Sequence, residues 1–287
     1  MIIQTAHRIR GEIQNSDSEI RELLPYARMQ EVAATQADAY AKARPFPHIV
    51  IDDFFDERIL DAILAEFPRP TDKMWEKHDI AEEIKLQSKH ERYIPPFTRQ
   101  FLYTLNSATF LEFLERLTGI DRLIGDPRFE GGGLHQITRG GKLAIHTDFN
   151  KQRYFGLDRR LNVLVYLNKN WKEEYGGHFE LWNSDMTRMV TKIAPIFNRM
   201  VIFTTSGDSF HGHPDPLNCP PDMTRKSMAL YYYTLGNQTA GNAGTAQNTL
   251  FQKRPGERFQ LNGQQLARDL TPPIVWRMLS RALKRDG

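Results

Sequence analysis

Several things that this sequence has little of narrow its class before any motif is considered. It contains one cysteine, Cys219, which excludes a disulfide framework within the chain. No stretch approaches the ~20 apolar residues that a membrane-spanning helix needs. Residues 1–6 lack the apolar run and cleavage pattern of a secretory signal. The net charge is only +3, without a central block of Lys and Arg, so nucleic acid is not an expected partner. We therefore predict a cytoplasmic protein.

The composition is that of a globular protein, with 40% hydrophobic and 25% charged residues. We predict an N-terminal helical arm at 1–44, a main domain at 45–236, and a linker with a basic amphipathic helix at 237–287. One face of that helix is apolar and the other basic, with Val275, Met278, Leu279 and Ala282 opposite Arg277, Arg281, Lys284 and Arg285. Packing on the domain is the simplest role for this helix, and contact with a membrane surface is the alternative. The oligomeric state stays open.

Between residues 131 and 235, short runs of β-branched and aromatic residues alternate with turn signals. The expected strands are 134–138, 143–146, 161–167, 178–182, 190–193, 201–204 and 228–233. Gly140-Gly141 and Gly176-Gly177 predict hairpins. Many short strands within about 100 residues predict a sandwich or barrel.

Flanking elements complete the predicted fold. A short strand is expected at 48–51, a helix after Asp56, and a second helix between Ser107 and Gly119. Residues 68–100 are charged and broken by proline, and predict loop with some helix. The fold class is therefore mainly β with flanking helices (α+β).

The candidate metal ligands begin with His146 and Asp148. They lie two residues apart at the end of an expected strand, so their side chains point the same way. A third ligand would come from His211 or His213, between which spacing alone does not choose. Two imidazoles and one carboxylate leave one face of a metal open, as in non-haem Fe(II) oxygenases. A catalytic zinc is less well matched, because the chain has no His-Glu-x-x-His helix motif.

A candidate site for a carboxylate-bearing co-substrate lies on two other expected strands. Arg225 offers a two-pronged donor for a carboxylate, and Ser227 adds a hydroxyl on the same strand face. Asn162 and Tyr166 supply polar groups from the strand at 161–167. A buried tyrosine hydroxyl needs a partner, which a carboxylate held by Arg225 would provide.

At these residues the chain resembles the Fe(II)- and 2-oxoglutarate-dependent oxygenases, and among them the prolyl-4-hydroxylase-like branch. The similar stretches are 45–54, 160–171 followed by Gly176-Gly177, and 195–203 followed by Ser209-Phe210-His211. They occur in the family's order and cover the region from 45 to 236.

The resemblance implies a double-stranded β-helix, or jelly roll, with Fe(II) held by His146, Asp148 and His211. It favours His211 over His213 and implies that Arg225 binds 2-oxoglutarate, assisted by Tyr166, Ser227 and Asn162. The implied reaction consumes O2 and 2-oxoglutarate, releases succinate and CO2, and hydroxylates an organic substrate. Ascorbate is an optional further cofactor.

The substrate is not fixed by these motifs. We favour a small molecule or saccharide; a protein prolyl hydroxylase is the alternative, and a non-catalytic, cupin-like metal- or sugar-binding protein the least favoured. Basic residues gather around the His-x-Asp motif: Arg139, Lys142, Lys151, Arg153 and Arg159. An anionic substrate would follow if several lined the site, whereas a solvated basic surface is an equally good interpretation.

Overall fold

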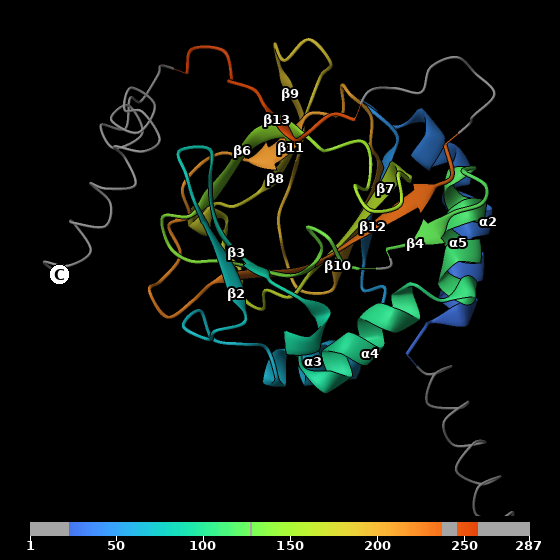
Figure 1. The fold of residues 1–287 in the computed structure, drawn as a ribbon, viewed down its shortest axis with the longest axis horizontal. Helices are drawn as coiled ribbons and strands as arrows, with labels where there is room; N and C mark the ends of the chain where they lie inside the picture. Colours follow the sequence, from blue (N-terminus) through green and yellow to red (C-terminus); the bar gives the residue numbers. More distant parts are fainter. Residues whose placement is uncertain (1–22, 127, 237–245, 258–287) are drawn as a thin grey trace, which may run out of the picture. The chain divides into compact units, whose positions relative to one another are not determined.

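The computed structural model describes residues 23–126, 128–236 and 246–257, and its core is a β-structure flanked by helices (Figure 1). A compact unit extends to Arg254. The strands are β1 (His48–Asp52), β2 (Trp75–Asp79), β3 (Glu83–Ser88), β4 (Ile124–Gly125), β5 (Gly133–Ile137), β6 (Lys142–Thr147), β7 (Asp158–Tyr166), β8 (Phe179–Trp182), β9 (Met189–Ile193), β10 (Arg199–Thr204), β11 (His211–His213), β12 (Arg225–Thr234) and β13 (Leu250–Phe251).

The strands form one antiparallel path in the order β1-β10-β7-β12-β5-β3-β6-β11-β8-β9. Sequence neighbours such as β5 and β6 are not paired with each other, because β3 lies between them and bonds to both. This interleaved order is typical of a jelly roll. The predicted fold class, mainly β with flanking helices around a double-stranded β-helix, is confirmed.

The central strands β7, β10 and β12 are buried on both faces. Successive side chains of a strand point to opposite faces, so Val163 and Val165 of β7 pack toward the helices. Leu164 and Tyr166 point the other way, toward the space between the two sides of the sheet. The face of β12 that carries Arg225 therefore points inward, where it lines a cavity.

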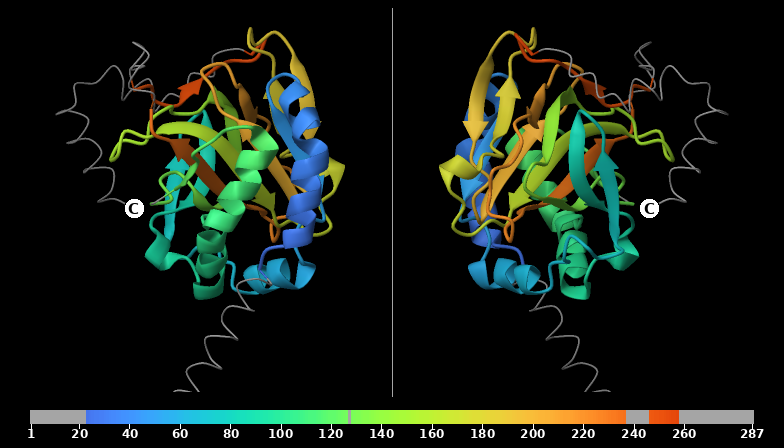
Figure 2. Two further views of the ribbon diagram at one scale, coloured as in Figure 1. Left: turned by 90° about the vertical axis from the view of Figure 1, so that its right-hand side faces the viewer. Right: turned by 90° about the vertical axis from the view of Figure 1, so that its left-hand side faces the viewer.

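Among the described residues, four α-helices lie outside the strands: α2 (Tyr26–Lys42), α3 (Glu57–Ala65), α4 (Pro96–Leu105) and α5 (Ala108–Thr118). Helix α2 lies alongside α5 (Figure 2). The Asp56 carboxylate caps α3 by accepting from the Arg58 amide, and α5 ends at Gly119 in a left-handed conformation, with φ of 70°. Both predicted helix boundaries are confirmed. No helix in the described part of the chain is both long and apolar enough to span a membrane.

Two of our predictions of local structure are wrong. Residues 68–100 are not loop with helix alone, because β2 and β3 form an antiparallel hairpin within them and β3 enters the main sheet. Gly140-Gly141 and Gly176-Gly177 do not close hairpins, because the strands on either side of each pair bond to other strands. In a jelly roll, strands that are consecutive in the sequence often lie in opposite sheets. The predicted C-terminal helix lies outside the described residues.

A buried carboxyl group beyond β4 offers a test of the packing. Asp126 is 2% exposed, and its Oδ2 has no hydrogen-bond partner among the described residues. Burial raises the pKa of Asp126 from 3.8 to about 6. The protonated carboxyl group therefore stabilises the folded protein fully below pH 3.8, the pKa of the unfolded chain, and this contribution is lost as the pH rises through 6. Asp126→Asn should therefore raise the free energy of unfolding by about 1–3 kcal/mol at pH 8 and by much less at pH 4. Urea denaturation at both pH values measures the free energy of unfolding. An equal change at pH 4 and pH 8 would contradict the raised pKa of Asp126.

Candidate active site

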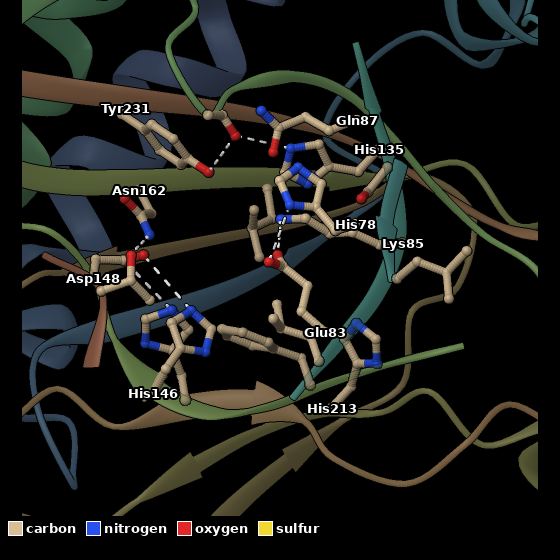
Figure 3. A pocket seen from close by; sticks show the side chains of 18 of the residues that line it. His78, Glu83, Lys85, Gln87, His135, His146, Asp148, Asn162, His213 and Tyr231 are labelled. Atoms are coloured by element: carbon tan, nitrogen blue, oxygen red, sulfur yellow. Dashed lines mark hydrogen bonds and ion pairs between the residues drawn. The ribbon is translucent and has the colours of Figure 1, made fainter. Parts of the chain in front are cut away.

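Three side chains that could bind a metal meet where β6 and β11 pair. His211 lies directly opposite His146 across the two strands, and Asp148 follows the end of β6. One potential ligand atom from each of the three lies within 4.8 Å of the others. Figure 3 shows Asp148 and His146 on the same side of the pocket. The fold thus brings together the three residues that the sequence suggested as metal ligands.

Both histidines of this trio are oriented by backbone carbonyls. The Nδ1 of His146 donates to the Ala144 carbonyl at 2.9 Å, and that of His211 donates to the Ser209 carbonyl at 2.8 Å, since a carbonyl can only accept. Each Nε2 therefore faces Asp148, at 3.7 Å from His146 and 3.4 Å from His211. Burial lowers the pKa of His211 to about 4, so the ring is neutral at pH 7. Neutral imidazoles with a fixed Nδ1 proton are the form that binds metals, and this donor set fits Fe(II).

His213 differs from His211 although both line the same cavity. A register irregularity falls between the two on β11, and the cross-strand partner of His213 is Leu143. His213 is not part of the described metal-binding cluster, and its Nδ1 has no hydrogen-bond partner among the described residues. The bulge therefore separates two histidines that spacing alone left equivalent.

The Asp148 carboxylate is held by two further side chains. Its Oδ2 accepts from the Asn162 amide at 2.8 Å and lies 3.2 Å from Nη2 of Arg159. Arg159 is itself buried and stacks over the Tyr231 ring, 3.5 Å from the ring centroid. Although burial by itself would raise the pKa of Asp148, the charge of Arg159 and the two histidines hold it well below its ordinary value. Asn162, which the sequence suggests as an assistant of the co-substrate, binds Asp148 through its side-chain amide and also lines the cavity.

Arg225 is the second buried arginine of the site. Its Nε donates to the Gly177 carbonyl at 2.8 Å, and its Nη2 lies 3.4 Å from the Tyr166 hydroxyl. No carboxylate among the described residues pairs with it, and burial lowers its pKa. Ser227 follows on the same strand face and also lines the cavity. A buried guanidinium without an anionic partner is costly, so the site fits an incoming carboxylate such as that of 2-oxoglutarate.

One cavity of about 270 Å³ joins the metal trio to Arg225. Its lining also includes polar residues that our sequence reasoning missed: His78 on β2, Glu83, Lys85 and Gln87 on β3, and His135 on β5. A signal for the β3 group was present, because residues 83–87 alternate charged or polar with aliphatic side chains, as a strand does. Phe251 of β13 also lines the cavity and lies against His146, with ring centroids 5.6 Å apart.

The basic residues around the His-x-Asp motif do not line the mouth together. Arg139 binds Asn218, Lys151 pairs with Asp158, and Arg153 pairs with Glu130. Of the five, only Arg159 lines the described cavity, where it is paired with Asp148. This cluster therefore gives no support to an anionic substrate.

A jelly roll with two histidines and one carboxylate at its mouth defines the class of mononuclear non-haem iron enzymes. Comparison of the sequence agrees with this class: residues 132–233 match the model of the 2OG-Fe(II) oxygenase superfamily. The matched stretch contains the metal trio and Arg225, and the protein is a 2-oxoglutarate-dependent dioxygenase that uses Fe(II). It is therefore an enzyme.

Solved structures with a similar fold include two prolyl hydroxylases. A prolyl hydroxylase from Trichoplax adhaerens, in complex with a hypoxia-inducible-factor peptide fragment, is 17% identical with a TM-score of 0.52, over 72% of this chain and 91% of that one. A prolyl-4-hydroxylase from Pseudomonas putida is 17% identical with a TM-score of 0.49, over 71% of this chain and 100% of that one. No curated protein sequence matches the chain. The Trichoplax structure shows a shared fold.

Proposed function

We propose that His146, Asp148 and His211 bind Fe(II), that Arg225 binds the distal carboxylate of 2-oxoglutarate, and that the enzyme hydroxylates a small molecule or saccharide. One observation carries the proposal: a buried arginine without an anionic partner among the described residues shares a cavity with the metal trio. Tyr166 would orient the Arg225 guanidinium, and the Ser227 hydroxyl would add a hydrogen bond to the carboxylate.

The chain's own residues supply positioning and exclusion of water. Bound Fe(II) and 2-oxoglutarate supply the oxidising chemistry, in which succinate and CO2 are released as the substrate is hydroxylated. The backbone bonds of His146 and His211 fix the direction of each Nε2. Phe179 and Phe203 pack against the His211 ring, with centroids 5.5 and 4.7 Å away, and keep that side dry.

The lining of the cavity supports a small substrate over a protein chain. Phe251 of β13 and Thr249, just before that strand, line the cavity, and β13 pairs with β6 beside the metal trio. The Phe251 ring lies 5.6 Å from the His146 ring, which would leave little room for an extended peptide beside the proposed iron. The polar groups of β2 and β3 add hydrogen-bonding capacity that a prolyl ring does not use.

Anaerobic absorbance tests the proposed iron and co-substrate site. Adding Fe(II) and then 2-oxoglutarate to the protein should produce a visible charge-transfer band, because the keto acid chelates the metal. The band should titrate to one equivalent of each. Iron that binds without any band on addition of 2-oxoglutarate would contradict the proposed site.

A further inference from the structure

The β2–β3 hairpin places a group of polar side chains in the same cavity as the proposed iron site. Glu83, Lys85 and Gln87 alternate along β3 and so share one face, while His78 comes from the paired strand β2. We call these four residues the polar wall. Figure 3 shows Glu83 and His78 in the centre and right of the pocket, with His146 and Asp148 on the left. None of the four is a proposed ligand of Fe(II) or of 2-oxoglutarate.

At the centre of the polar wall is a partly buried ion pair. Lys85 Nζ lies 2.8 Å from Glu83 Oε1, and the two side chains are 10% and 14% exposed. The other oxygen of Glu83 lies 3.3 Å from Nδ1 of His78. Although burial alone would raise the pKa of Glu83, the hydrogen bond from His78 and the charge of Lys85 lower it to about 2. The wall therefore carries full charges that compensate each other locally.

The polar wall keeps hydrogen-bonding capacity that the described residues do not use. The Gln87 amide makes no side-chain hydrogen bond within the described part of the chain, although the residue is only 9% exposed. The Nε2 of His78 is buried without a partner there. Lys85 uses one of its three N–H groups on Glu83. Buried polar groups of this kind require partners, so their presence in a cavity points to a polar ligand.

We propose that the polar wall is the substrate subsite and that it binds neighbouring hydroxyl groups of a neutral polyhydroxylated ring, such as a sugar or cyclitol. This inference rests on the proposed function. An anionic group beside Lys85 would be repelled by Glu83, and a cationic group beside Glu83 would be repelled by Lys85. A hydroxyl both donates and accepts, so it is the neutral group that satisfies an adjacent donor and acceptor together. The Gln87 side-chain amide, next after Lys85 on the same face of β3, also offers both a hydrogen-bond donor and an acceptor.

His135 extends the polar wall from the neighbouring strand β5. Its Nε2 donates to the Gly131 carbonyl at 2.9 Å, which leaves the Nδ1 as an acceptor. Burial is the main cause that lowers the pKa of His135, to about 3, so the ring stays neutral. A further neutral acceptor can bind a hydroxyl group of the ligand.

Three ring-matched probes test the proposal: D-glucose, D-glucuronate and D-glucosamine, which are neutral, anionic and cationic on one scaffold. Binding is measured by saturation-transfer NMR on the protein loaded with Zn(II) and 2-oxoglutarate, a diamagnetic form of the complex. The neutral sugar should bind at least about 5-fold more tightly than either charged probe, because burying an uncompensated charge is unfavourable. Tighter binding of a charged sugar, or no binding of the neutral one, would overturn the proposal.

Two variants give a result that a structural role would not produce. Glu83→Gln leaves Lys85 without its counter-ion and should shift the preference toward glucuronate, whereas Lys85→Met should shift it toward glucosamine. Opposite shifts cannot arise from a shared loss of folding. Lys77→Met, the same kind of change on the exposed face of β2, is the matched control and should keep the neutral preference. Shifts in the same direction, or none, would overturn the proposal. If the wild type also lacks the Fe(II)–2-oxoglutarate band, it is the proposed function that fails.

Discussion

Replacing His211 by alanine is expected to abolish the Fe(II)–2-oxoglutarate band and to lower 2-oxoglutarate turnover by more than about 100-fold. Removing an outer hydrogen-bond partner of a metal ligand typically costs roughly 10–100-fold, and His211 is proposed as a ligand itself. Its Nε2 lies 3.4 Å from Asp148 and its ring is fixed by the Ser209 carbonyl. Bound iron, measured by elemental analysis, and succinate formation give the two readouts.

His213→Ala is the matched comparison, since it removes the same side chain from the same strand. His213 lies outside the His146, Asp148 and His211 cluster, so this variant should keep its iron and the absorbance band. If His213→Ala loses iron while His211→Ala retains it, the ligand assignment is reversed. Equal loss in both variants would mean that β11 has lost its pairing with β6, which a circular dichroism spectrum reports.

Replacing Arg225 by methionine is expected to raise the KM for 2-oxoglutarate by about 10- to 100-fold. Hydrogen bonds to charged groups contribute about 1.5–3 kcal/mol each, and Arg225 has no competing carboxylate among the described residues. Arg225→Lys should recover part of the affinity, because it keeps the charge but not the two-pronged geometry. Initial rates of succinate formation at varied 2-oxoglutarate concentration measure the effect.

Arg199→Met is the control for the loss of an arginine. Arg199 lies on β10 and pairs with the half-exposed Asp52, outside the cavity, so its removal should leave the KM unchanged. An unchanged KM in Arg225→Met would contradict the co-substrate site. Lys85 or Arg159, the other cationic side chains that line the described cavity, would then be the candidates for binding the carboxylate of 2-oxoglutarate.

Local patterns in the sequence predicted much of the fold and of the metal trio. The strands around His146 and Arg225 could be predicted because polar and apolar residues alternate there and β-branched residues are frequent. Helices α3 and α5 could be predicted from Asp56 at the start of one and Gly119 at the end of the other. We did not predict the β2–β3 hairpin, because the sequence on either side of it is rich in charged and polar residues. Its alternation was readable, but its polar face points into the cavity, the reverse of an ordinary half-buried strand.

The sequence by itself indicated the reaction class, because the ligand types, their order along the chain and the spacing of His146 and Asp148 can be read without the fold. Only the tertiary structure decided which residues surround the proposed metal ligands. The bulge on β11 separates His211 from His213, and pairing with β5 and β6 carries Glu83 and Lys85 into the cavity. Such neighbours are set by strand register over long chain separations. A one-residue slip would turn every side chain of a strand to the opposite face, and no local pattern records that choice.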